Sequence, residues 1–125
     1  MKVDISSSED VKLLVDSFYN KVKLNPVIGF IFTDVAKVNW EHHLLKMYAF
    51  WESILLGGPP YGGNPMVPHI QLSKITPLTE KEFSTWLSLF NETMDELFEG
   101  PVANEGKARA ANIAALMLYK IQSNQ

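Results

Sequence analysis

Four stretches of the chain carry apolar side chains at the spacing of an α-helix, and no stretch shows the alternation of a β-strand. The first stretch opens with Ser6 and Glu9, which have capping-box spacing, and ends at Asn25-Pro26. Its apolar face consists of Val11, Leu14, Val15, Phe18 and Val22. Such a face must pack against other helices, so the pattern predicts an all-α fold.

The other three stretches have their own boundary signals. The second begins near Asn39 and stops at Gly57-Gly58. The third follows a second capping box, formed by Thr79 and Glu82. The fourth, residues 102–122, is rich in alanine, a strong helix former that lets neighbouring helices approach closely. We therefore expect four main helices.

The segment between the second and third helices, residues 57–79, differs from the rest in composition. It holds four of the seven glycines and five of the seven prolines. It also carries more apolar side chains than a solvated loop can expose. Long connections of this kind inside compact domains are usually functional or disordered. We expect an ordered loop, with at most one helical turn opened by Pro68.

Composition excludes several classes of protein. The 125 residues suit a single domain, and 46% apolar with 20% charged residues is an ordinary globular balance. The absence of cysteine excludes disulfides, thiolate catalysis, zinc fingers, iron–sulfur clusters and covalent haem attachment through C-x-x-C-H.

Charge and hydropathy restrict the partners. The net charge is −3 and no basic run is present, which argues against nucleic acid. The longest apolar run has seven residues, from Ile113 to Tyr119, where a membrane span needs about 20. The first residues lack the apolar core of a signal peptide. We expect a soluble, cytoplasmic protein.

Three histidines are the candidates for metal chemistry: His42, His43 and His69. His43 shares a helical row with apolar residues and His42 with mostly polar ones, so we expect His43 to face inward and His42 outward. His69 lies among apolar residues in a proline-stiffened loop, a setting that favours the neutral imidazole and so suits metal ligation. Two other interpretations stay open: a core-edge His43 satisfied by a backbone group, and a half-buried loop histidine at position 69.

Aromatic residues from several segments could surround these histidines. Tyr19, Phe32 and Trp86, together with His43 and His69, could form the walls of a flat apolar cavity that a haem would fill. Two alternatives remain. One is a haem-free helical interaction module in which the aromatic residues are only core, and the other is a non-haem metal enzyme, which no His-x-x-x-His or Glu-x-x-His pair supports.

The chain resembles the truncated haemoglobins, and most closely group III of that family. The resemblance runs from about Glu9 to Tyr119. It is carried by Ser17-Phe18-Tyr19-Asn20-Lys21-Val22, Gly29-Phe30-Ile31-Phe32, Trp40-Glu41-His42-His43, Phe50-Trp51-Glu52-Ser53-Ile54-Leu55-Leu56-Gly57, Tyr61-Gly62-Gly63-Asn64-Pro65, His69 and Phe83-Ser84-Thr85-Trp86-Leu87. Each fragment is weak alone, but their order and spacing together are specific.

The resemblance implies a shortened globin fold over residues 1–125: a 2-over-2 helical sandwich with a long ordered proximal loop and non-covalent haem b. His69 matches the proximal iron ligand, and Tyr19, His43 and Trp86 match distal residues that stabilise a bound gas. Lys46 is a candidate partner for a haem propionate. The remaining haem contacts expected are Phe32, Met47, Phe50, Trp51, Tyr61, Met66, Leu72 and Phe83.

The same resemblance implies O2, NO and CO as ligands. Several hydrogen-bond donors beside the ligand would slow its escape, which favours O2/NO redox chemistry or ligand handling over bulk transport of O2. Reversible oxygen binding or sensing is the other possibility. NO dioxygenase or peroxidase-like turnover would need a separate reductase, since 125 residues leave no room for a fused one.

Overall fold

The computed structural model describes residues 2–58 and 66–123, and within these ranges the chain is helical, with no strand. The α-helices are α1 (Ser8–Leu24), α2 (Trp40–Leu55), α3 (Met66–Ser73), α4 (Glu80–Leu97) and α5 (Pro101–Ser123). A short π-helix, η1 (Ile31–Val35), lies in the connection between α1 and α2.

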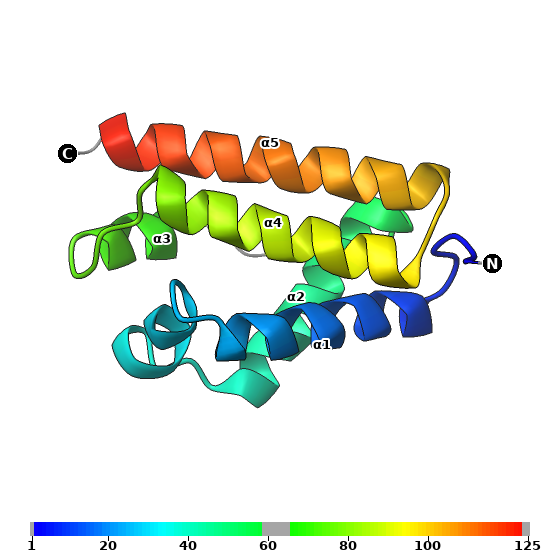
Figure 1. The fold of residues 1–125 in the computed structure, drawn as a ribbon, viewed down its shortest axis with the longest axis horizontal. Helices are drawn as coiled ribbons and strands as arrows, with labels where there is room; N and C mark the ends of the chain where they lie inside the picture. Colours follow the sequence, from blue (N-terminus) through cyan, green and yellow to red (C-terminus); the bar gives the residue numbers. More distant parts are fainter. Residues whose placement is uncertain (1, 59–65, 124–125) are drawn as a thin grey trace.

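The four long helices form two packed pairs. Figure 1 shows α4 and α5 side by side, with α1 crossing α2 below them. Helix α1 also contacts α4, so the pairs share one core, and α3 packs against α5. The expected all-α sandwich of two helices over two is confirmed.

The start of α1 differs from the expectation. The N-cap is Ser7, whose hydroxyl accepts a hydrogen bond from the Asp10 amide at 3.3 Å. Asp10 in turn accepts from the Ser6 amide at 2.9 Å. The predicted box of Ser6 with Glu9 is therefore wrong, and the N-cap lies one residue later. All three consecutive serines can cap a helix, and the Asp10 side chain bonds the amide of Ser6 rather than that of the N-cap Ser7, so no reciprocal capping box forms.

The other predicted helix starts are confirmed. The Asn39 side chain caps α2 by accepting from the His42 amide at 3.2 Å. Thr79 and Glu82 form a capping box at the start of α4, in which Glu82 accepts from the Thr79 amide at 2.7 Å. These caps matter for the site because the residue at which a helix begins determines which of its side chains face the cavity.

Helix α3 is longer than expected. It has eight residues and starts two positions before Pro68, so the prediction of at most one turn opened by that proline is wrong. Proline is tolerated there because the first turn of a helix does not need its N–H groups for internal hydrogen bonds. Residues 59–65, including Tyr61, lie outside the described part of the chain.

Polar contacts around the core join the long helices. The Ser8 hydroxyl donates to Glu52 at 2.6 Å, and the Tyr48 hydroxyl donates to Asp16, so α1 and α2 are linked at two levels. Lys21 of α1 forms ion pairs with two glutamates of α4, Glu92 at 3.3 Å and Glu96 at 2.7 Å.

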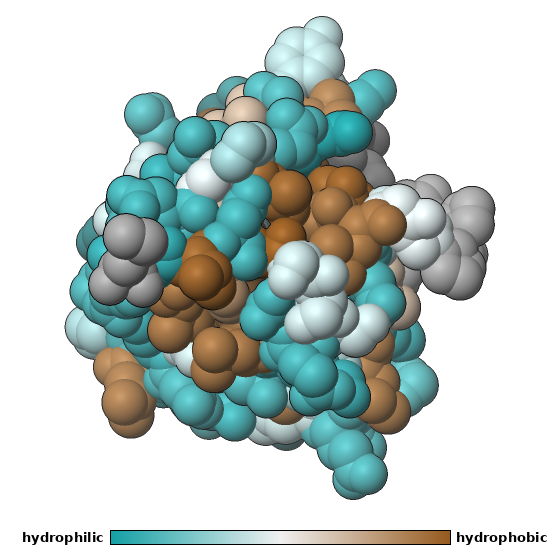
Figure 2. Space-filling view, turned by 90° about the vertical axis from the view of Figure 1, so that its right-hand side faces the viewer, coloured by the Kyte–Doolittle hydropathy of each residue, from teal (hydrophilic) through white to brown (hydrophobic). Residues whose placement is uncertain are grey.

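The core between the pairs is closely packed. Gly106 lets α5 approach its neighbours, because a Cβ there would lie 2.8 Å from Met94 Cε and 3.3 Å from a Leu55 methyl carbon. The largest fully buried side chains are Phe18, Phe90, Leu14, Met94, Ile121, Val11, Val15 and Val22. Figure 2 views the end at which the N-terminus lies: apolar residues reach the surface in the middle of this face and hydrophilic residues surround them. Exposed apolar atoms of this kind are common on folded proteins.

The residues before α1 hold the start of α5. The Asp4 carboxylate accepts hydrogen bonds from the Val102 and Ala103 amides, both at 2.9 Å. The Val3 carbonyl accepts from the Glu99 amide at 3.0 Å. Gly100, with φ +141°, is required beside them because a Cβ there would lie 2.6 Å from Asp4 Cγ. Asp4 thus supplies from a distant part of the chain the cap that α5 lacks locally.

We expect Asp4→Ala to lower the free energy of unfolding by about 1–2 kcal/mol, the usual cost of losing a helix cap. Burial acts to raise the pKa of Asp4, but the amides of Val102, Ala103 and Ile5 outweigh it and lower the pKa, so the carboxylate is charged at neutral pH. Urea unfolding followed by circular dichroism measures the loss. Asp34→Ala, at an exposed carboxylate, is the control and should change stability by less than about 0.5 kcal/mol.

Candidate functional site

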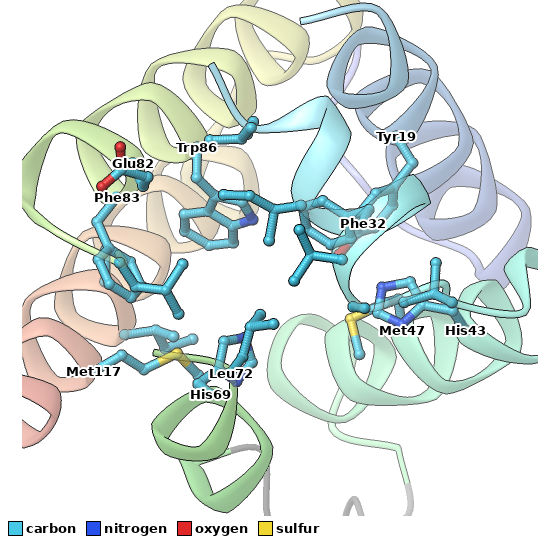
Figure 3. A pocket seen from close by; sticks show the side chains of 18 of the residues that line it. Tyr19, Phe32, His43, Met47, His69, Leu72, Glu82, Phe83, Trp86 and Met117 are labelled. Carbon is cyan, nitrogen blue, oxygen red and sulfur yellow. The ribbon is translucent and has the colours of Figure 1, made fainter. Parts of the chain in front are cut away.

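A cavity of about 500 Å³ lies between the two helix pairs. Side chains of α1, η1 and all the later helices reach it, and most of them are apolar (Figure 3). Its lining consists of Tyr19, Ile28, Ile31, Phe32, Val35, Ala36, Val38, His43, Met47, Phe50, Trp51, His69, Gln71, Leu72, Ile75, Leu78, Glu82, Phe83, Trp86, Ile113, Ala114 and Met117.

Helix α3 presents an imidazole to the cavity. His69 and Leu72 are three residues apart, so they lie on the same face of α3, and both point into the space in Figure 3. This orientation depends on the helix that the sequence did not predict: in a loop, the direction of His69 would not be fixed by its neighbours. His69 thus lines the cavity, and its expected role as the iron ligand stays a prediction.

Tyr19 of α1 and Trp86 of α4 lie across the cavity from His69 (Figure 3). Tyr19 is only 4% exposed, and burial raises its pKa, so the phenol keeps its proton at neutral pH. Trp86 is stacked on Phe90 at 5.8 Å between ring centroids and meets the edge of Phe18 at 5.7 Å. Phe18 also meets Tyr19 at 4.8 Å, so both potential donors pack against buried aromatic residues.

His43 of α2 forms a side wall of the cavity, whereas His42 is exposed, as the helical rows predicted. The buried Nε2 atom of His43 has no hydrogen-bond partner among the described residues. Burial lowers its pKa to about 4, with smaller contributions from the charges of His69, Lys46 and His42. His43 is therefore neutral at pH 7. A backbone partner for His43 was one interpretation of the sequence, and the described residues provide none for its Nε2 atom.

The lowered pKa of His43 makes stability depend on pH. Its pKa is about 4 when folded and 6.5 when unfolded, so between these values the unfolded chain binds more protons. Stability is therefore lost as the pH falls from 6.5 to 4. Because the side chain is partly exposed, we expect a loss of about 1–3 kcal/mol rather than the full value of the shift. Urea unfolding of the haem-free chain at a series of pH values measures it.

His43→Leu is the reference for that measurement. Its free energy of unfolding should fall less steeply between pH 6.5 and 4, while other acid-sensitive groups contribute equally to both proteins. Equal slopes for the two proteins would contradict the prediction.

The structure brings most of the expected haem contacts together. The cavity-lining residues that the sequence predicted are Tyr19, Phe32, His43, Met47, Phe50, Trp51, His69, Leu72, Phe83 and Trp86. Lys46 is exposed on α2 and does not line the cavity, so its pairing with a propionate remains a prediction. Met66 belongs to α3, but its side chain, like the whole of Tyr61, lies outside the description.

Several residues of the wall were not predicted. Apart from Phe32, these include the part formed by η1 and its flanking residues, and also the second half of α5. The residues concerned in these two parts are Ile28, Ile31, Val35, Ala36, Val38, Ile113, Ala114 and Met117. The others are Gln71, Ile75, Leu78 and Glu82. On α5, Ile113 and Met117 are four residues apart and could have been recognised as one apolar row. For η1 no sequence signal was available, because a π-helical turn has no characteristic residue pattern.

The cavity fits a haem. Its walls are largely apolar, an imidazole enters from α3, and the unpartnered Nε2 of His43 could be satisfied by a small polar ligand. Within residues 2–58 and 66–123, no three His, Cys, Asp or Glu side chains are grouped to hold a metal ion, so a non-haem metal site has no support there. A 2-over-2 helical sandwich around such a cavity defines a globin.

Comparisons with known proteins agree with this class. A family model for the "Bacterial-like globin" family matches residues 4–118. The Group 3 truncated hemoglobin ctb of Campylobacter jejuni is 32% identical over 126 residues, covering 96% of this chain and 97% of that protein. The crystal structure of the group III truncated haemoglobin from Campylobacter jejuni superposes with a TM-score of 0.83 at 29% identity, covering 97% of this chain and 95% of that one.

The chain therefore belongs to the bacterial-like globin family and, within it, to the group III truncated haemoglobins. As a globin it is a haem protein that binds diatomic gases. No helix in the described ranges combines the length and apolar character needed to cross a membrane.

Proposed function

We propose that haem b is held non-covalently in the cavity with His69 as the protein ligand of its iron. The observation that carries this proposal is the position of the His69 imidazole, which enters the cavity opposite Tyr19 and Trp86 (Figure 3). Bound haem would supply the iron to which a diatomic gas binds. The largely apolar walls would disfavour water beside the bound gas.

Three side chains are the proposed hydrogen-bond donors to the gas. Tyr19 keeps its hydroxyl proton because burial raises its pKa. The indole N–H of Trp86 can only donate. His43 is neutral, so one of its ring nitrogens carries a proton, and the buried Nε2 is the nitrogen without a partner. All three come from the part of the wall that does not hold His69.

Several donors favour retention of the gas over its delivery. A neutral hydrogen bond contributes about 0.5–1.5 kcal/mol, so two of them slow dissociation on the order of tenfold to a hundredfold. We propose O2/NO redox chemistry or ligand handling, including NO dioxygenase or peroxidase-like turnover with a separate reductase, rather than bulk O2 transport. Reversible binding or sensing is the second candidate, since the same donors serve it. The cytoplasmic location expected from the sequence stays a prediction.

Two measurements test the proposal. Titration of the haem-free chain with haemin should give one haem per chain and an intense Soret band; a folded chain that takes up no haem would overturn the proposal in favour of a helical interaction module. Stopped-flow mixing of the oxygen-saturated ferrous protein with NO then separates the two candidates. Rapid oxidation to the ferric protein with stoichiometric nitrate supports redox turnover, whereas displacement of oxygen by NO without nitrate supports reversible binding or sensing.

A further inference from the structure

Three aromatic rings enclose the His43 imidazole. Its centroid lies 5.1 Å from Tyr19 at an interplanar angle of 84°, 6.0 Å from Phe32 at 64°, and 5.9 Å from Trp40 at 86°. Tyr19 and Phe32 line the cavity. Trp40 does not, so it contacts His43 without belonging to the cavity lining.

Trp40 is itself held from several directions. Phe32 stacks on it at 5.8 Å with an interplanar angle of 25°, and Tyr19 meets it edge-on at 5.7 Å. The Lys23 Nζ atom lies 4.5 Å from the centre of its ring, a cation–π contact from the last turn of α1. Trp40 is also the first residue of α2, directly after the Asn39 cap. The indole is thus fixed by both helices and by η1.

In the part of the chain that the structure describes, no hydrogen bond holds the Nε2 side of the His43 imidazole. Its Nε2 atom is buried and without a partner among the described residues. A histidine on a helix has more than one staggered χ1 rotamer, and its χ2 torsion is broad. The orientation of this ring is therefore set by the aromatic surfaces around it. Trp40 is three residues before His43, so it packs against the same side of α2.

We propose that Trp40, held by Lys23 and Phe32, is the positioning residue that keeps the His43 imidazole turned toward the cavity. The inference rests on the proposed function, because the orientation of His43 matters only beside a bound gas. An edge-to-face aromatic contact favours one arrangement over another by about threefold to tenfold. Loss of Trp40 should shift the populations of His43 orientations by that factor.

Infrared spectra of the ferrous haem protein saturated with carbon monoxide report this shift, because the CO stretching frequency depends on the nearest hydrogen-bond donor. Trp40→Leu should change the relative areas of the CO bands by about threefold to tenfold. Trp40→Phe, which keeps an aromatic surface, should restore most of the wild-type spectrum. Lys23→Met, which keeps the aliphatic stem but removes the charge, should give a smaller change in the same direction. Lys12→Met, at an exposed position on the same helix, should give none.

The same substitution in a chain that lacks the His43 imidazole distinguishes an effect of Trp40 on that imidazole from a general disturbance of the fold. In a chain that carries His43→Leu, adding Trp40→Leu should leave the CO bands unchanged, because the residue through which Trp40 acts is gone. A change of the same size in both backgrounds would overturn the inference. Identical spectra of the wild type and Trp40→Leu would overturn it as well.

Nuclear magnetic resonance of the haem-free chain gives a readout that does not depend on haem. Couplings that report χ1 of His43 should show one dominant rotamer in the wild type and averaging in Trp40→Leu. A single unchanged rotamer in both would overturn the inference. A chain that takes up no haem overturns the proposed function instead, and the rotamer measurement still decides the role of Trp40.

Discussion

His69→Gly is expected to weaken haem binding by at least about a hundredfold and to abolish the spectrum of an imidazole-ligated iron. Second-shell partners of metal ligands already contribute about tenfold to a hundredfold to affinity, and His69 is the proposed ligand itself. The measurement is transfer of haem to an acceptor protein, followed at the Soret band. Free imidazole added at millimolar concentration should restore the spectrum, because glycine leaves the space that the side chain occupied.

His42→Gly is the matched control for that variant. Both substitutions put glycine into a helix, which costs up to about 1 kcal/mol, but His42 is exposed on α2 and does not line the cavity. Its haem affinity and spectrum should therefore be those of the wild type. Wild-type spectra for His69→Gly without added imidazole would remove His69 from the role, and His43 would become the imidazole to test.

Tyr19→Phe combined with Trp86→Phe is expected to accelerate the dissociation of oxygen from the ferrous haem protein on the order of tenfold to a hundredfold. Each single variant removes one donor and should account for about threefold to tenfold. Phenylalanine at position 86 keeps an aromatic ring against Phe90 and Phe18, so the packing is largely preserved. Stopped-flow displacement of oxygen by carbon monoxide gives the rate.

Tyr48→Phe is the matched control for the loss of a phenol. Tyr48 donates to Asp16 at the α1–α2 interface and does not line the cavity. Burial, together with the bond to Asp16, raises the pKa of Tyr48 to about 12, so its hydroxyl is also a neutral donor. The variant should leave the dissociation rate unchanged. An unaltered rate in the Tyr19→Phe, Trp86→Phe double variant would exclude both residues from ligand stabilisation.

Helical periodicity predicted the features that depend on one element at a time. The inward position of His43 and the outward position of His42 follow from their rows on α2, and the caps at Asn39 and Thr79 follow from local hydrogen bonding. The sequence does not identify which serine is the N-cap of α1, because the neighbouring Ser6 and Ser7 can cap a helix equally well. The sequence could not decide between them.

The features that depend on several elements were harder to predict. Helix α3 has eight residues in a segment dominated by proline and glycine, and its packing against α5 outweighs that local composition. The wall formed by η1 depends on a π-helical turn, in which Thr33 donates to the Gly29 carbonyl. The aromatic residues suggested one cavity for His69, Tyr19 and Trp86. Only the resemblance to a known family indicated that His69 lies opposite the other two, since no spacing in the sequence relates the three.

The hydrogen bonds between Asp4 and the start of α5 have a practical consequence for measurements of haem binding and ligand kinetics. The second half of α5 supplies part of the cavity wall, through Ile113, Ala114 and Met117. An affinity tag joined rigidly just ahead of Asp4 would disturb the capping contacts at the start of the helix that forms this part of the wall. Purification handles should therefore be separated from the amino-terminal residues by a long glycine–serine spacer, or removed before ligand kinetics are recorded.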